Sequence, residues 1–305
     1  MTKNTDIFDG IGEWLDVYKR NSVKPTTYDR LVTSKNSLHD YPIAMLSLRE
    51  VGSDDVQHYV NELVRDGYAH TTIKKQYGLV TSFLKYAYAN GYLSRPIYGV
   101  KLPSQSSVRK KKRDVAAYSE IEEARLRVIF ETLETPLYGA ALLMLETGMR
   151  VGEVLALTWD DIFWGRRAVR INKTLIRITN ESDSTRVQEG AKSYFSNRLV
   201  PLSERAISVL RRLGPGDGYI FANDRGDPIT YEALRWQIQK ACKRARVEYR
   251  GMHIFRHTFA TNCYKRGCDV KILSKLLGHA DVTITYNVYI HLFGDALDEM
   301  RKVIG

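Results

Sequence analysis

Several residues in the second half of the chain have side chains that act on phosphate groups. Arg256 follows His253 by three positions in HIFRH, and Arg150 lies between two glycines in TGMRVGE. Helical positions three apart share a face, so His253 and Arg256 are expected to project together. A guanidinium is a planar cation that pairs with two phosphate oxygens, and an imidazole exchanges protons near neutral pH. These residue types suit chemistry on a phosphate.

Two further motifs add a histidine and two tyrosines. In LLGH, Gly278 fits the residue after a helix, and His279 follows where that helix ends. Tyr286 and Tyr289 lie three positions apart in TITYNVYIH, so both can face one cleft. With 19 tyrosines in the chain, any one of them is more often structural than catalytic. An isolated histidine is also more often a structural residue.

Lys192 and Glu153 complete the set of candidates. Lys192 lies on a polar tip before a short strand, where a lysine is usually an ordinary surface residue. Glu153 follows Arg150 by three positions, so it can fix the guanidinium or simply form a buried ion pair with it. None of these residues identifies a site when taken alone.

A metal site at the histidines is not expected. His257 follows His253 by four positions, a spacing that allows two ligands on one helix face. However, Arg256 would repel a cation, the glutamate of HExxH is missing, and the three cysteines lack CxxC spacing. We therefore predict no metal and no cofactor.

The elements that position these residues follow from apolar periodicity and capping signals. In residues 1–105 the sequence predicts four helices, at 7–20, 25–38, 54–66 with Ser53 as N-cap, and from Thr71 or Thr72 to Asn90-Gly91. Further helices are expected at 119–133, 136–147, 151–157, 203–213, 230–246, 253–266, 269–277 and 281–290. A β-rich stretch at 168–178, a polar excursion at 179–191 and a strand at 198–201 predict one small antiparallel sheet. The second part is therefore α+β.

Over a third of the net charge of +11 lies in a linker between these two parts. Residues 106–114 hold five basic side chains and one acidic side chain. Such a basic strap displaces counterions from DNA, although a solvated linker that touches nothing is an equal alternative. The DNA-contact candidates lie in this strap and on two predicted helices: Lys74, Lys75, Arg109, Lys110, Lys111, Lys112, Arg113, Arg235, Gln239, Lys240 and Lys243.

The remaining composition points to the cytoplasm. The sequence has no apolar run of membrane-spanning length, no signal-peptide order at its start, and three cysteines too few for a disulfide framework. It also lacks the GxxxxGK[ST] loop that binds nucleotide phosphates.

Together and in this order, five motifs resemble the tyrosine recombinase (phage integrase) family. They are TGMRVGEVLALTWDDI, AKSYFSNRLVPL, HIFRHTFAT, LLGHADVTIT and YNVYIH. TTIKKQYGLVTSFLKYAYANGYLSRPIYGVKLP is similar to the end of that family's core-binding domain, so the resemblance covers nearly the whole chain. The departures are Arg95-Pro96 where Asn-Pro is usual, and the long polar stretch at 179–191. With no arm-type domain expected before residue 7, the architecture is similar to that of the Xer recombinases.

The resemblance implies a mainly α fold with a small antiparallel sheet. A four-helix core-binding (SAM-like) domain would span 1–105, a basic linker 106–115, and an α+β catalytic domain with a C-terminal docking helix 116–305. It further implies a DNA-breaking and rejoining enzyme that forms a 3′-phosphotyrosine, with Tyr289 rather than Tyr286 as the nucleophile. The implied catalytic residues are Arg150, Lys192, His253, Arg256, His279 and Tyr289, with Glu153 and His257 as support.

The implied partners are double-stranded DNA with specific core sites and other copies of the chain. The family expectation is a homotetramer on DNA, a monomer or weak dimer when free, a nucleoid location, and room for accessory DNA-bending proteins. The amphipathic segment 295–305 is expected to dock on a neighbouring protomer, with packing on its own domain as the alternative. Two other functions remain open, a type IB topoisomerase-like enzyme and a non-catalytic DNA-binding protein of the same fold.

Overall fold

The fold is taken from a computed structural model, which describes residues 1–108, 117–178, 185–190, 197–279 and 281–289. The side chains of residue 284 and residues 287–289 fall outside this description. The chain divides into two compact units, and the main boundary between them falls inside the undescribed stretch 109–116. Each unit has a hydrophobic core of its own.

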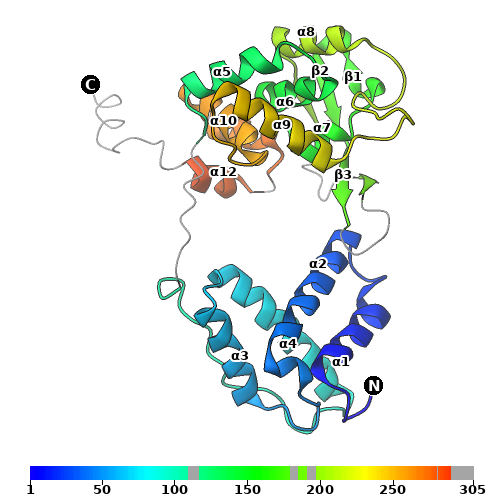
Figure 1. The fold of residues 1–305 in the computed structure, drawn as a ribbon, viewed down its shortest axis with the longest axis vertical. Coiled ribbons are helices and arrows are strands. Elements are labelled where there is room, and N and C mark those ends of the chain that lie inside the picture. The colour runs from blue at the N-terminus through cyan, green and yellow to red at the C-terminus, as the bar shows by residue number, and fades with distance from the viewer. Residues whose placement is uncertain (109–116, 179–184, 191–196, 280, 290–305) are drawn as a thin grey trace. The chain divides into compact units, whose positions relative to one another are not determined.

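The N-terminal unit contains, within its described residues, four α-helices, which Figure 1 shows in blue to cyan. They are α1 (Ile7–Trp14), α2 (Pro25–Asn36), α3 (Ser53–Arg65) and α4 (His70–Ala89). A π-helix at Leu15–Lys19 prolongs α1, and 3-10 turns at Ser37–Asp40 and Pro42–Met45 follow α2. Most apolar side chains at helical spacing are buried and form the core, with Tyr59 and Phe83 fully buried among them.

One predicted cap in this unit is wrong by a residue. Ser53 is the first residue of α3, and Gly52 is the N-cap. The Gly52 N–H donates to the carboxylate of Asp55 at 2.8 Å, which satisfies a donor that the helix itself leaves open. Ser53 instead uses its hydroxyl to accept the Tyr98 N–H at 3.0 Å. The start of the helix is therefore stabilised by Asp55.

The C-terminal unit is mainly helical. Its described helices are α5 (Glu120–Phe130), α6 (Pro136–Thr147), α7 (Val151–Leu155), α8 (Glu204–Leu213), α9 (Tyr231–Ala245), α10 (His253–Lys265), α11 (Val270–Leu277) and α12 (Val282–Tyr289). Short 3-10 turns at Trp159–Asp161 and Trp164–Arg166 flank the first strand. All eight predicted helices of this unit are present, with ends that differ by up to three residues.

Two small antiparallel sheets, rather than one, are found in the described residues of this unit. β1 (Ile162–Phe163), β2 (Ala168–Ile171) and β5 (Arg198–Pro201) form the first, in the order β1-β2-β5. β3 (Lys173–Arg177) and β4 (Thr185–Glu189) form a separate pair, with Leu175 opposite Val187. The polar stretch expected at 179–191 therefore contains a strand. Its backbone bonds to β3 stabilise β4 although the side chains are polar.

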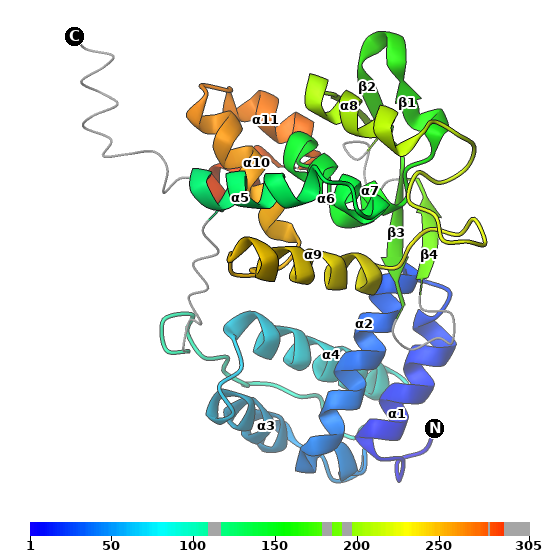
Figure 2. The same ribbon diagram turned by 45° about the horizontal axis from the view of Figure 1, so that its top comes forward.

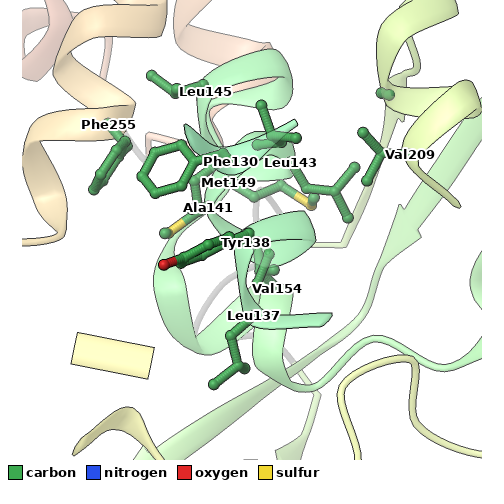
Figure 3. Close-up of a cluster of buried hydrophobic side chains, with 14 of the residues drawn as sticks. Phe130, Leu137, Tyr138, Ala141, Leu143, Leu145, Met149, Val154, Val209 and Phe255 are labelled. Atoms are coloured by element: carbon green, nitrogen blue, oxygen red, sulfur yellow. The ribbon is translucent and has the colours of Figure 1, made fainter. Parts of the chain in front are cut away.

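Helix α6 is the centre of the C-terminal core. It is apolar except for Glu146 and Thr147 near its end, and it packs against α5, α8, α9 and α10. Figure 2 shows the other helices of the unit around it. Figure 3 shows the rings of Phe130, Tyr138 and Phe255 gathered beside it. The Phe130 ring lies 5.6 Å from Tyr138 and 5.9 Å from Phe255 between centroids. This packing holds the first turn of α6, whose opposite end is part of the candidate site.

None of the helices in the described ranges combines the length and the apolar character that a membrane crossing requires.

Candidate active site

The ends of α6 and α11 are where the candidate site is built. Each helix ends at a glycine in the left-handed conformation, Gly148 with φ 66° and Gly278 with φ 67°. The last carbonyls of a helix have no partner within it, so they can accept from side chains. A side chain at position 148 would collide with the ring of Phe259 and lie 2.9 Å from Leu277 Cδ2. The two glycines therefore allow two helix ends to meet closely.

Arg256 lies on α10 and is bound by these helix ends. The residue is 4 % exposed. Its Nη1 donates to the Gly148 carbonyl at 2.9 Å, and its Nη2 donates to the Leu277 carbonyl at 2.7 Å. The same Nη2 lies 2.7 Å from His279 Nε2. The guanidinium is thus fixed by main-chain oxygens.

Arg150 precedes α7 and contacts both Glu153 and the end of α11. Its backbone N–H donates to Glu153 Oε2 at 2.9 Å, and its Nη1 donates to Oε1 at 2.9 Å. Its Nη2 donates to the Gly278 carbonyl at 3.2 Å. The side chain keeps 35 % of its surface exposed, so the guanidinium borders solvent while its orientation is fixed.

Arg198, at the start of β5, is a site residue that the sequence analysis did not select. Its side chain is 8 % exposed and pairs with both Glu153 oxygens, at 3.1 and 2.9 Å. Its Nε donates to the Leu276 carbonyl at 2.7 Å. Glu153 and Arg198 are 45 positions apart, so helical spacing does not predict their contact. The only sequence signal for Arg198 is its position in the predicted strand RLVP. We call Arg150, Arg198, Arg256, Glu153 and His279 the arginine cluster.

The charges of the arginine cluster act on Glu153. Burial alone would raise the pKa of this carboxyl, but the hydrogen bond and charge of Arg198 and the charge of Arg150 outweigh it and lower the pKa. Glu153 is therefore ionised near neutral pH. Arg150 and Arg198 share Glu153, while the hydrogen bonds described for Arg256 go to main-chain carbonyls and His279. Guanidiniums fixed in this way suit an anionic phosphodiester.

His279 follows α11 and contacts two groups. Its Nε2 lies 2.7 Å from Arg256 Nη2, and its Nδ1 lies 2.7 Å from the hydroxyl of Thr285 on α12. Burial, followed by the charges of Arg256 and Arg150, lowers the pKa of His279 to about 4. The ring is therefore neutral at pH 7. Thr285, which is fully buried, is a second residue that the sequence analysis did not select.

His253 and His257 lie on the first turns of α10, beside Arg256. Their ring centroids are 5.8 Å apart, with edge-to-face geometry. Desolvation by the surrounding protein and then the charge of Arg256 lower the pKa of His253, although the residue is exposed. An exposed, neutral imidazole can accept a proton.

The structure thus brings together four of the predicted residues, Arg150, Glu153, Arg256 and His279, with His253 and His257 beside Arg256. Lys192 lies outside the described residues. Position 289 ends α12, and its side chain is also outside the description. Tyr286 is 46 % exposed.

The predicted DNA-contact residues that can be placed lie on exposed helix faces. Lys74 and Lys75 are exposed on α4, and Arg235, Lys240 and Lys243 are exposed on α9, with Gln239 partly exposed. Trp236, which the sequence analysis did not select, is 58 % exposed on α9, and Lys240 Nζ lies 5.5 Å from its ring centroid. Residues 109–113 of the strap lie outside the described residues.

No three histidine, cysteine or acidic side chains of the described residues gather in the way that a metal ion would require.

Comparisons with known proteins show what the chain is similar to. A curated relative called "Tyrosine recombinase XerC-like" from Caldanaerobacter subterraneus subsp. tengcongensis is 29 % identical over 306 residues, covering 92 % of this chain and 77 % of the relative. The integrase of Staphylococcus phage L54a is 24 % identical, covering 92 % and 87 %. Among solved structures, this chain is similar to the Tn1549 transposon integrase in complex with transposon right end DNA. The two are 18 % identical, and the match covers 99 % of this chain and 100 % of that chain. The TM-score of 0.77 shows a shared fold.

The family assignment follows from the conserved-domain comparison. The model of the phage integrase family matches residues 118–295, more than half of the chain and nearly all of the C-terminal unit. That range holds all the residues of the arginine cluster. This chain belongs to the phage integrase family.

Proposed function

We propose that the chain is a site-specific DNA recombinase, which cleaves and rejoins DNA strands through a 3′-phosphotyrosine on Tyr289. The observation that carries the proposal is the meeting of Arg150, Arg256 and His279 at the ends of α6 and α11. Family membership and the curated relatives called recombinase and integrase support it.

The arginine cluster suits the transition state of this reaction. Attack of a tyrosine oxygen on a DNA phosphate gives a pentacoordinate phosphorus with extra negative charge on its non-bridging oxygens. Arg150 and Arg256 would hold those oxygens, and His279 would donate a further hydrogen bond. Donors fixed before the reaction need no reorganisation when the charge develops, which makes this stabilisation large.

Two proton transfers accompany the exchange of bonds. Tyr289 forms the new O–P bond and must lose its phenolic proton, which ordinarily has a pKa of about 10. His253 would take that proton, since it is exposed and its lowered pKa keeps it neutral. The departing 5′ oxygen needs a proton, which Lys192 would supply. Rejoining reverses these steps, so neither a nucleotide nor a metal is required.

DNA binding would use both units. Exposed cations of α4 and α9 and the strap at 109–113 are the proposed contacts. We further propose a tetramer on DNA, since a lambda integrase that shares the fold has been solved as a tetramer bound to a Holliday junction. Exchange of residues 295–305 between protomers, accessory DNA-bending proteins and location at the nucleoid belong to the same proposal.

Trapping of the covalent intermediate tests the function. The probe is a duplex that the wild-type protein selects from a randomised library, synthesised with a nick at successive positions so that cleavage releases a short fragment. Wild type and Tyr286→Phe are expected to form a protein–DNA adduct in EDTA without nucleotide, and Tyr289→Phe is not.

Three outcomes would contradict the proposal. An adduct with Tyr289→Phe would move the nucleophile elsewhere. A strict requirement for Mg²⁺ or ATP would exclude the mechanism. Relaxation of plasmids that lack a selected site would indicate a type IB topoisomerase instead.

A further inference from the structure

Thr285 is a buried residue whose hydroxyl meets one of the proposed catalytic groups. It lies on α12, is 0 % exposed, and its Oγ1 is 2.7 Å from His279 Nδ1. On the other side of the ring, His279 Nε2 is 2.7 Å from Arg256 Nη2. Both ring nitrogens are therefore engaged, one with a hydroxyl and the other with a guanidinium.

The chemistry of these partners fixes the position of the ring proton. A guanidinium has donors and no acceptor, so His279 Nε2 must accept from Arg256. The proton of the neutral ring then resides on Nδ1 and is donated to Thr285 Oγ1. The lowered pKa of His279 agrees with a neutral ring.

This tautomer differs from the one that the reaction needs. A His279 that stabilises a phosphate oxygen must carry its proton on Nε2, and its Nδ1 must then accept a hydrogen bond. A carbonyl or carboxylate beside Nδ1 could only accept a hydrogen bond, so it would stabilise only the tautomer that carries its proton on Nδ1. A hydroxyl both accepts and donates, so Thr285 can serve both.

We propose that Thr285 is a positioning residue that holds His279 in both neutral tautomers and so lets Nε2 change from accepting from Arg256 to donating to the scissile phosphate. The inference rests on the proposed function. When the phosphate becomes the acceptor for Arg256, Nδ1 releases its proton to water, Nε2 takes one from water, and the Thr285 hydroxyl turns to donate to Nδ1. The ring is neutral before and after, so the charge balances.

The place of Thr285 gives this contact a second effect. Thr285 and Tyr289 are four positions apart on α12, and such positions lie on the same side of a helix. A displacement of α12 that separates Thr285 from His279 therefore also displaces the backbone of the proposed nucleophile. The tautomer of His279 therefore depends on the position of α12.

Substitution of Thr285 tests the proposal with the nicked duplex described above. Thr285→Val keeps the shape of the side chain and removes the hydroxyl. We expect unchanged DNA affinity and adduct formation slower by about tenfold to a hundredfold, as for a buried group left without a partner. Thr285→Ser keeps the hydroxyl and should restore most of the rate. Thr283→Val, at an exposed position of the same helix, is the matched control and should behave as wild type.

The ring nitrogens report the tautomer directly through ¹⁵N NMR of histidine-labelled protein, with His279→Gln used for assignment. Free wild type should carry the His279 proton on Nδ1. Tyr289→Phe bound to the selected duplex, which cannot be cleaved, should carry it on Nε2. In Thr285→Val bound to DNA, the Nε2 form should be reduced.

The outcomes separate the two proposals. No adduct from wild type on any selected duplex would overturn the recombinase function and the tautomer change with it. A wild-type adduct together with a normal rate in Thr285→Val would overturn the role of Thr285 alone. An Nε2 proton already present in the free protein would also overturn it.

Discussion

The arginine cluster and the cationic face of α9 carry charge of the same sign but hold it in opposite ways. Arg198 and Arg256 are 8 % or less exposed, and carbonyls or a carboxylate fix their guanidiniums. On α9, Lys240 and Lys243 are exposed, and the ammonium group of Lys240 lies over the ring of Trp236. The buried arginines of the arginine cluster lose their conformational entropy during folding, whereas the exposed lysines of α9 keep theirs.

This difference separates two uses of positive charge. Ordering a long side chain costs about 1.5–2 kcal/mol of conformational entropy, so a cation fixed in advance stabilises a transition state without that cost. An exposed lysine adapts to whichever phosphate it meets, and its contribution to affinity comes from released counterions. We therefore expect variants of the arginine cluster to change rate and stability, and variants of α9 to change affinity.

The largest expected effect is on cleavage by Arg256→Lys. Lysine keeps the charge but cannot reach the Gly148 carbonyl, the Leu277 carbonyl and a phosphate together. The rate of adduct formation should fall by about 10²–10³ while affinity for the selected duplex stays close to that of wild type. A loss of affinity as large as the loss of rate would remove the distinction between the two regions.

Glu153→Gln should mainly affect stability. The substitution leaves Arg198 and Arg150 without their shared carboxylate, and breaking a buried ion pair costs about 3–5 kcal/mol of folding free energy. The control is Glu134→Gln, which breaks an exposed ion pair with Arg244 and should cost far less stability, because solvent screens an exposed pair. Denaturant unfolding of both variants measures the difference, and equal losses would contradict it.

Neutralising α9 should change affinity and its dependence on salt. Lys240→Gln with Lys243→Gln is expected to reduce the slope of log affinity against log salt by about two phosphate contacts, at a normal cleavage rate on saturated duplex. Arg244→Gln is the matched control on the same helix, because the carboxylate of Glu134 already balances that guanidinium at 2.6 and 2.9 Å. If the slope of log affinity against log salt is unchanged in the double variant, the DNA does not bind at Lys240 and Lys243.

The smallest expected effect is on acid stability. The pKa of His279 is about 4 in the folded protein and near 6.5 when unfolded, so between these values the unfolded chain binds the extra proton. Stability should therefore fall as the pH is lowered from 7 to 5, with about 1–2 kcal/mol of the fall due to His279. His279→Gln should remove this part and His58→Gln, at an exposed position, should not. Parallel pH profiles for all three proteins would disprove the assignment.

Local sequence signals predicted the helical fold well. Pro136 and Gly148 delimit α6, and Asp269 and Gly278 delimit α11, because proline, a capping carboxylate and a left-handed glycine each determine a helix end locally. The mainly α fold with antiparallel strands is confirmed. The motifs also pointed to Arg150, Arg256 and His279, since residue type and helical spacing are visible in the sequence. The roles of these residues stay predictions.

Features that depend on distant partners were missed. β4 has a polar sequence, and only its pairing with β3 makes it a strand. Arg198 acquires its place from Glu153 and from the Leu276 carbonyl, and Thr285 from His279. The π-helix at Leu15–Lys19 changes the hydrogen-bond spacing, so the helix that periodicity predicted as continuous over 7–20 is divided there. The places of β4 and Arg198 arise from tertiary contacts that local spacing does not encode.

The main-chain oxygens that hold the arginines have a consequence for mutational drift. The acceptors at Gly148, Leu276, Leu277 and Gly278 belong to the backbone, so no codon change deletes them. Side chains at 276 and 277 can therefore vary within packing limits while the guanidiniums keep their acceptors. The site is instead most sensitive to substitution at position 148, where any side chain would collide with Phe259 and Leu277 and separate the two helix ends. Harmful substitutions at this site should thus concentrate at a residue that itself has no chemistry.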